Sequence, residues 1–456
     1  MIDLSKVSRL GIVLVIAGYL AACAVAGSDD KSVDDRRQLV HVLGESARLD
    51  EYTSALNAIA GTDSLRQWHE MFCAEPHPAG SAAMHRLNNV LAEQFENMGL
   101  EVARHEFQAY LSEPRDAELQ IVNTGRENDQ SDLPITLPIQ ERPLKEDPYS
   151  DHDDLTFGWN AYAATGDVTG EVVYANYGTK EDFETLQKLG VQVEGRIVLT
   201  RYGRNYRGYK AKFAEQAGAI GLIMYTDPGN SGYRRGVPYP HGGYANETAI
   251  QRGSIKTLAY PGDPLTPGRE ASADATRRDP ADVDLPSIPV QPVGWAAAKE
   301  IMSRMQGPHV PREHYRKWQG GLPFAYRLTG GPTLEVRLHV EQKRSMKNCT
   351  NVIGTLKGAR WPDEKIIVGC HSDAWSFGAG DPHAGSIVLY EMAKCFAHAA
   401  QNGWRPDRTI IFANWDAEEF GIIGSTEWVE ANADDLSANA VAYINLDMAA
   451  MGPNFG

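Results

Sequence analysis

The sequence contains few cysteines, few basic residues relative to acidic ones, and no evident internal repeat. Five cysteines occur in 456 residues and none are closely spaced, which argues against a disulfide framework and against a CxxC metal site. Lys and Arg number 44 against 60 Asp and Glu, so the formal net charge of −16 argues against a nucleic-acid partner. The length exceeds what one compact core usually supports, so we expect more than one domain.

Long hydrophobic runs are also scarce. The apolar segment Leu10–Leu20 is too brief to span a bilayer, and it leads into Leu20-Ala21-Ala22-Cys23, which fits the lipobox of exported bacterial lipoproteins. We therefore expect a signal peptide over residues 1–22, lipidation of Cys23, and a polar tether over residues 23–48. An uncleaved apolar anchor is the alternative. Both interpretations place the protein outside the cytoplasm on a membrane, at the outer membrane or the periplasmic face.

Three short apolar runs in the last hundred residues are typical of buried strands. They are Lys365–Gly369, Arg408–Asn414 and Val441–Leu446, and a segment with helical spacing, Gly385–Asn402, separates the first two. Strands that alternate with a helix predict an α/β fold with a doubly wound, mostly parallel sheet. Such sheets bind ligands at the carboxyl ends of their strands.

Residue types that bind metals follow these runs. His371, the pair Glu418-Glu419 and Asp447 each come at the end of a run, and Asp381 lies in a Gly-rich loop after the first. Imidazole and carboxylates suit zinc, and two zinc ions can share a bridging carboxylate. Adjacent glutamates in an extended segment point to opposite sides, so one can bind metal while the other acts as general base. Any one of these acids alone would more often be a surface charge; together they predict a metal-dependent hydrolase.

Four segments resemble the metal-binding segments of the M28 zinc peptidases, in particular the glutamate carboxypeptidase II branch of that family. These segments are Cys370–Trp375, Gly380–Gly385, Asn414–Gly421 and Tyr443–Asp447. The resemblance implies that His371 and Asp447 bind one zinc and that Glu419 binds a second. It implies that Asp381 bridges both ions and that Glu418 is the base. It also implies that Asp373 orients the ring of His371.

Three further features accompany these segments. Cys370 stands where family members usually carry glycine. The Asp381–Pro382 bond is expected to be cis, because a bridging carboxylate must be aimed back at two ions and X-Pro bonds adopt this isomer at a cost of about 0.5–1 kcal/mol. His77 lies in a turn that resembles a family turn, and it is either a metal ligand or a structural histidine.

The resemblance divides the folded part into a protease domain and an insert. Residues 49–111 and 346–456 are assigned to the protease domain, and residues 112–345 to a protease-associated domain. Helices are predicted over Leu49–Phe72 and Ala82–Met98. A helix followed by a strand is predicted over Lys210–Tyr225 in the insert.

The resemblance also implies ligand contacts in the insert. Arg207 matches an arginine that holds the terminal carboxylate of the substrate, although by itself it would equally be a solvated loop residue. Ser254 replaces a pocket asparagine. A calcium site is implied, with unliganded surface glutamates as the alternative. Its expected ligands are Thr266, Arg269, Glu427 and Glu430.

The family pattern continues beyond Asp447 with a second zinc-binding histidine and a helical dimerisation domain, whereas this sequence stops at Gly456. We therefore expect a fragment that lacks that domain and binds about one zinc instead of two, with little activity. The complete protein is expected to be a homodimer.

The predicted function is that of a membrane-tethered, zinc-dependent exopeptidase, a carboxypeptidase or dipeptidase acting on peptides that end in an acidic residue. An M28 aminopeptidase of other specificity is one alternative. A non-catalytic binding protein with the architecture of the transferrin receptor is another.

Overall fold

The computed structural model describes residues 46–124 and 133–450 of the chain. Cys23, the predicted signal peptide and most of the predicted tether lie outside these residues. Ten strands form one large mixed sheet, and two short strands form a second sheet. The strands are β1 (Glu101–Asn123), β2 (Ile135–Thr136), β3 (Asn160–Ala161), β4 (Gly166–Tyr174), β5 (Ile197–Arg201), β6 (Gly221–Tyr225), β7 (Gly253–Ser254), β8 (Val290–Val293), β9 (Glu335–Leu356), β10 (Trp361–His371), β11 (Arg408–Trp415) and β12 (Ala440–Asn445).

Helices surround this sheet. The α-helices are α3 (Ser46–Ile59), α4 (Thr62–Phe72), α5 (Ala82–Asn97), α6 (Lys180–Lys188), α7 (Arg207–Gln216), α8 (Trp295–Arg304), α9 (Arg312–Trp318), α10 (His383–Gln401), α11 (Ile423–Ala431) and α12 (Ala433–Asn439). Two short 3-10 helices are η3 (Pro148–Asp151) and η4 (Pro280–Asp282). In the described residues, no helix combines the length and the apolar character needed to cross a membrane.

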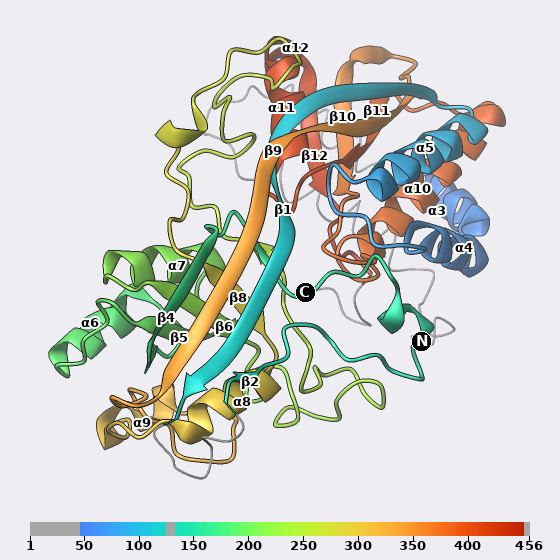
Figure 1. The fold of residues 1–456 in the computed structure, drawn as a ribbon. Coiled ribbons are helices and arrows are strands. Elements are labelled where there is room, and N and C mark those ends of the chain that lie inside the picture. Colours follow the sequence, from blue (N-terminus) through green and yellow to red (C-terminus); the bar gives the residue numbers. More distant parts are fainter. Residues whose placement is uncertain (1–45, 125–132, 451–456) are drawn as a thin grey trace.

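Two long antiparallel strands, β1 and β9, run the length of the molecule (Figure 1). One end of β9 pairs with β11 through Val352–Leu356, and the other end pairs with β4 through Glu335–Val340. A single strand thus belongs to two separate wings of the sheet. The expected domain boundaries near Leu111 and Met346 fall inside these strands, where Leu111 faces Ser345 across the ladder.

The wing that contains the predicted metal site has β12, β10 and β11 in parallel, with helices on both faces. Alternate residues of β11 face opposite ways, because side chains of a strand alternate between the faces of a sheet. Phe412 packs with helices α4, α5 and α10 on one face, whereas Trp415 packs with Trp428 of α11 on the other. The predicted doubly wound, mostly parallel α/β fold is confirmed.

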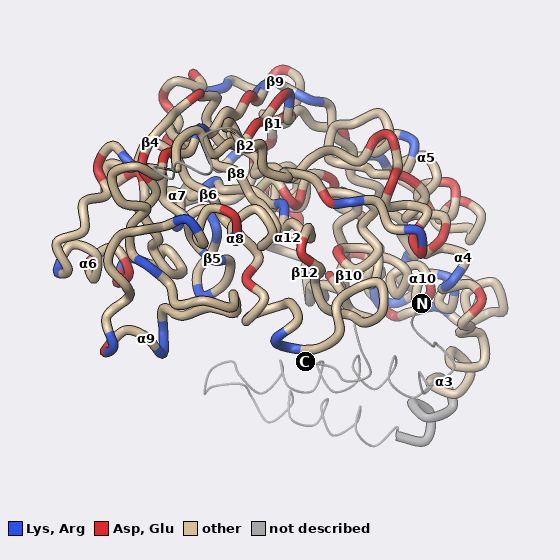
Figure 2. Tube along the Cα trace, turned by 60° about the horizontal axis from the view of Figure 1, so that its bottom comes forward, with Lys and Arg blue, Asp and Glu red and all other residues tan. Residues whose placement is uncertain are grey.

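The other wing contains β4, β5, β6 and β8 in parallel order. Its core includes Val198, Leu222 and Val290, which are fully buried. Helix α7 followed by β6 matches the helix and strand predicted over Lys210–Tyr225. Acidic and basic residues are interspersed along the trace of both wings (Figure 2).

The single helix predicted over Leu49–Phe72 is wrong, because the chain forms two helices, α3 and α4. The break comes at Gly61, whose backbone is extended and whose N–H donates a hydrogen bond to Glu391 Oε1 at 2.7 Å. Ser64 donates to the other oxygen of the same carboxylate at 2.7 Å. A buried side chain of α10 therefore holds the start of α4, and no local signal in the sequence reports that long-range contact.

Candidate active site

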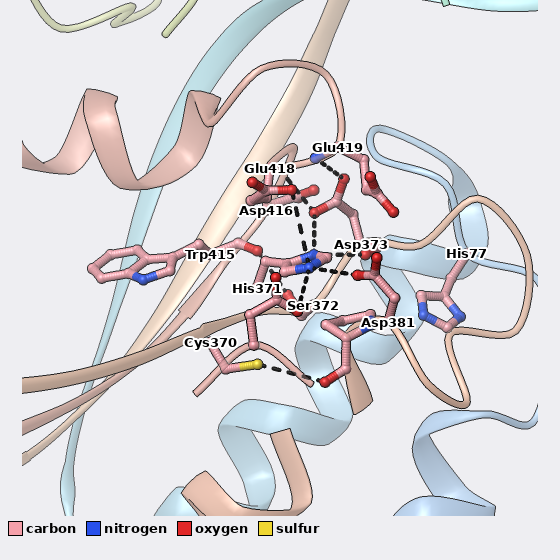
Figure 3. Close-up of polar contacts among 12 residues, drawn as sticks. His77, Cys370, His371, Ser372, Asp373, Asp381, Trp415, Asp416, Glu418 and Glu419 are labelled. Atoms are coloured by element: carbon pink, nitrogen blue, oxygen red, sulfur yellow. Dashed lines mark hydrogen bonds and ion pairs between the residues drawn. The ribbon is translucent and has the colours of Figure 1, made fainter. Parts of the chain in front are cut away.

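His371, the last residue of β10, lies at the centre of a group of carboxylates (Figure 3). Its Nε2 is 3.0 Å from Asp381 Oδ1, 3.4 Å from Asp447 Oδ1 and 4.0 Å from Glu418 Oε2. The parallel pairing of β10 with β12 places His371 and Asp447 at the same edge of the sheet. Ligand atoms of His371, Asp381 and Asp447 all lie within 4.8 Å of one another.

Asp373 connects the imidazole to the glutamate pair. His371 Nδ1 lies 3.0 Å from the backbone oxygen of Asp373 and 3.5 Å from its Oδ1, so Nδ1 carries the proton that it donates there. The same carboxylate accepts hydrogen bonds from the backbone N–H of Glu418 at 2.9 Å and of Glu419 at 3.2 Å. The expected contact between Asp373 and the His371 ring is present. The bonds to the two glutamates are an addition that the sequence did not reveal.

The glutamate pair lies on a turn, not in the extended segment that the sequence suggested. β11 ends at Trp415, and Ala417 then adopts a left-handed φ of 59°, which is uncommon for a residue with a Cβ atom. This turn sends the two side chains to different places. Glu418 approaches His371, whereas Glu419 lines a cleft that Asp381 also lines. The separation of the two side chains therefore comes from the turn and not from strand alternation.

The carboxylates carry strongly shifted pKa values. Burial, together with the nearby Asp373, Asp447 and Asp381, raises the pKa of Glu418 to about 7. Burial and the nearby Asp381 raise the pKa of Glu419 well above its ordinary value. Burial lowers the pKa of His371, but the nearby carboxylates of Asp373, Asp381 and Asp447 outweigh it and hold that pKa well above its ordinary value. The cluster therefore favours a positive charge at its centre.

The geometry fits a metal ion. His371 donates through Nδ1, so its Nε2 lone pair faces the oxygens of Asp381 and Asp447, an arrangement that needs a cation or a proton between them. Asp447 Oδ1 is buried and has no hydrogen-bond donor among the described residues. One imidazole nitrogen and two carboxylate oxygens form a ligand set that zinc accepts, with its fourth position open.

Close packing holds Asp447 in this place. Leu446 N–H donates to Gly369 O at 2.9 Å, and a Cβ at Gly385 would overlap the carbonyl oxygen of Leu446. Gly385 thus lets the first turn of α10 approach the end of β12.

Cys370, which stands where family members usually carry glycine, has a structural contact of its own. Its thiol donates to Pro382 O at 3.6 Å, and burial raises its pKa to about 12. The thiol is protonated and directed at the backbone. The Asp381–Pro382 bond is cis, as predicted.

A cleft of about 650 Å³ opens beside the metal ligands. Its walls come from α4, from the loop between β10 and α10, and from the insert, which contributes Arg207. Arg207 Nε is buried and has no hydrogen-bond acceptor among the described residues. A Cβ at Gly253 would overlap the guanidinium group, so this glycine makes room for Arg207. Arg252, in contrast, is paired with Glu141 through two bonds of 2.7 and 2.9 Å.

Ser254 does not line this cleft. Its side chain is 2% exposed, its Oγ accepts a hydrogen bond from Lys256 N at 3.2 Å, and its backbone oxygen accepts one from the Tyr206 hydroxyl at 2.7 Å. The residue supports the backbone next to Arg207.

The expected calcium ligands lie near one another, but both carboxylate oxygens of Glu427 already have hydrogen-bond partners. Glu427 accepts hydrogen bonds from Asp263 N at 2.7 Å and Ala271 N at 2.6 Å. Thr266 donates to Asp263 Oδ2 at 3.1 Å, whereas Glu430 Oε2 is buried without a partner among the described residues. The nearby ammonium group of Lys256 donates to Gly262 O at 2.6 Å. Arg269 N–H donates to Thr266 O at 3.3 Å, which closes a turn in the same loop.

His77 does not join the metal group. Its Nε2 lies 2.9 Å from Nε2 of His383, and both rings are buried. The sequence contained no signal for this pairing of two histidines that lie 306 positions apart.

Two families match parts of the chain. Residues 351–454 match peptidase family M28, and residues 168–258 match the PA domain. A solved structure described as a peptidase M28 precursor from Shewanella amazonensis has the same fold, with a TM-score of 0.54 and 15% identity over 86% of this chain and 72% of that one.

Curated relatives are similar over most of the chain. A glutamate carboxypeptidase 2 homolog from Caenorhabditis briggsae is 37% identical over 416 residues, which are 85% of this chain and 51% of that protein. The aminopeptidase NAALADL1 from Rattus norvegicus is 34% identical over 461 residues, which are 96% of this chain and 58% of that protein. The chain thus spans roughly half to three-fifths of the length of these relatives. Residues 351–454 of the chain thus belong to peptidase family M28, beside a PA segment, in a sequence that resembles these relatives over most of its length.

Proposed function

We propose that the protein is a zinc-dependent exopeptidase, a carboxypeptidase or dipeptidase that removes a C-terminal acidic residue. The observation that carries the proposal is the convergence of His371, Asp381 and Asp447 on one point, with Glu418 beside them. Membership of the M28 family supports metallopeptidase chemistry. Zinc, when bound, would polarise the scissile carbonyl and lower the pKa of water.

The residues of the chain divide this work. His371 would hold the ion through Nε2, because its Nδ1 is committed to Asp373. Glu418 accepts the proton of the attacking water, since a carboxyl group with a pKa of about 7 is suited to proton transfer near neutral pH. Glu419, at the cleft beside Asp381, would hold a second zinc. Asp373 keeps the two glutamates and the imidazole in a fixed relation.

Arg207 supports a substrate with a free terminal carboxylate. Its guanidinium lines the cleft that contains Asp381 and Glu419, and its buried Nε lacks an acceptor. An arginine can bind a carboxylate through two parallel hydrogen bonds. The name of the relative from Caenorhabditis briggsae, a glutamate carboxypeptidase 2 homolog, supports glutamate as the residue removed.

The second candidate is an aminopeptidase of another specificity, which the name of the rat relative, aminopeptidase NAALADL1, favours. A test on matched peptides separates the two. We expect cleavage of an N-acetylated dipeptide that ends in glutamate, and much slower cleavage of the same peptide with a C-terminal amide. Arg207→Met should raise KM for the free acid more than for the amide. Cleavage that requires a free amino terminus and ignores the C-terminal amide would favour the aminopeptidase. A chain that binds both peptides without cleaving either would favour a binding protein.

Metal content tests the centre directly. The described residues bring three ligands to one point, and Glu419 and Asp381 are the ligands proposed for a second ion, so we expect about one tightly held zinc per chain. Elemental analysis after dialysis measures this, with His371→Ala as the variant that should lose the metal. Two tightly held ions would require a ligand that we have not identified.

Three further features belong to this proposal. We propose that Cys23 is lipidated. Labelled fatty acid should enter the wild type and not Cys23→Ser, and equal labelling of the two would contradict the proposal.

Homodimerisation is proposed for the complete protein, and sedimentation would test it. Calcium binding near Glu427 and Glu430 is proposed because Glu430 Oε2 is buried and unpaired among the described residues. Calorimetric titration with calcium should lose its signal in Glu430→Gln.

A further inference from the structure

The three residues that converge on the metal position are not held equally firmly. His371 ends strand β10, and Asp447 follows β12 closely enough for Leu446 N–H to bond Gly369 O. Asp381 instead lies in the loop between β10 and α10, and its side chain is 47% exposed. The position of Asp381 therefore depends on whatever fixes this loop.

His77, from the turn before α5, is hydrogen-bonded to this segment at three points. Its backbone N–H donates to Ser376 O at 3.2 Å, and its backbone oxygen accepts from Ala374 N at 3.3 Å. Its ring contacts His383, the second residue after Asp381. The loop also packs on the second ring, because a Cβ at Gly378 would come within 2.9 Å of His383 Cδ2.

The hydrogen bonds determine which nitrogens of the pair carry protons. His77 Nδ1 lies 2.7 Å from the backbone oxygen of Glu75, which can only accept, so Nδ1 carries the proton and Nε2 is the acceptor. His383 then donates its Nε2–H to His77 Nε2 at 2.9 Å. This leaves His383 Nδ1 buried and without a partner among the described residues, which is a cost in folding free energy. The stability of the fold alone gives little reason for a histidine at position 383.

We propose that His77 and His383 are positioning residues that hold the loop of Asp381 so that its carboxylate meets His371 and Asp447. The inference rests on the proposed metal centre. Neither ring is a ligand in this proposal. The pair acts through the backbone at residues 374, 376 and 383, and its loss lets Asp381 move away from the ion.

The test measures zinc affinity by competition with a chromophoric chelator, and the visible spectrum of the Co²⁺-substituted chain. We expect His77→Leu and His383→Leu each to weaken zinc binding by about tenfold or more, as is typical for residues that orient metal ligands. The double variant should be about as weak as either single variant, because both break one contact. His383→Gln can still donate an N–H to His77 and should recover most of the affinity.

Tyr390→Phe is the matched control. Tyr390 is buried on the same helix α10, and its hydroxyl donates to Leu91 O and accepts from Asn414 Nδ2, each at 3.0 Å; neither partner belongs to the loop of Asp381. Tyr390→Phe should lower the urea concentration at the midpoint of unfolding without changing zinc affinity or the Co²⁺ spectrum. Unchanged affinity in both leucine variants overturns the inference, as does an equal loss in Tyr390→Phe or no recovery in His383→Gln. If the wild type binds no zinc, the metal centre itself fails.

Discussion

Asp373 shows how much one buried carboxylate can organise. It is fully buried, it lies beside the proton-bearing nitrogen of His371, and it accepts the backbone N–H groups of both glutamates. The orientation of the His371 ring and the placement of Glu418, the proposed metal ligand and the proposed base, are thereby linked through one side chain. A change at Asp373 should disturb both together.

The division of roles proposed for the two glutamates gives a prediction at the same scale. Glu418→Gln keeps the shape of the side chain but cannot accept a proton, so turnover should fall by roughly 10²–10⁴-fold while zinc content stays the same. Glu419→Gln should instead lower metal content. Kinetics and elemental analysis on the same preparations decide this. Retained metal in Glu419→Gln with metal lost from Glu418→Gln would reverse the assignment.

The elements that form the site meet at close contacts between α10 and β12. Parallel pairing with β10 gives β12 its register, and Gly385 permits the approach of α10 to Leu446. Asp447 is the second residue after the end of β12 and directly follows Leu446. The geometry of one metal ligand therefore depends on the packing of a helix against the end of a strand.

Gly385→Ala tests that contact. The added methyl group would overlap Leu446 O, so the end of β12 must shift, at a cost of about 1–3 kcal/mol in unfolding free energy and with weaker zinc binding. Urea unfolding and chelator competition measure the two effects. Gly243→Ala is the control, because a Cβ there has no neighbouring atom within 4 Å. Equal behaviour of the two variants would show that the contact is unimportant.

At the scale of the whole molecule, β1 and β9 pass through both wings without interruption. A third cluster of buried residues lies between the wings and includes Trp159 and Tyr162 of the insert with Phe420, next to the glutamate pair. Trp159 and Phe420 have ring centroids 6.1 Å apart. The insert thus packs directly against the turn that carries Glu418 and Glu419.

Shared strands and a shared core predict that the two wings unfold together. Calorimetry should show one transition for the chain, and zinc should raise its midpoint as a whole, since a ligand present at 100 times its Kd stabilises by about 2.7 kcal/mol. His371→Ala should abolish the zinc-dependent shift and leave a single transition. Two transitions, with only one sensitive to zinc, would show that the wings are independent.

The sequence by itself determined the local features of this protein. The apolar runs Lys365–Gly369, Arg408–Asn414 and Val441–Leu446 predict the three parallel strands β10, β11 and β12, because buried strands carry their own hydrophobic signal. The residue types at their ends identify the chemistry. The α/β class and the family follow from these short segments.

The tertiary structure decided what depends on distant contacts. Glu391 binds the start of α4 at Gly61 from 330 residues away, and β9 extends through both wings because it has partners on both. The turn at Ala417 aims the glutamates, and His77 meets His383 across 306 positions. Such contacts leave no periodic or local pattern, since they are set by how folded elements pack, and only the folded chain brings them together.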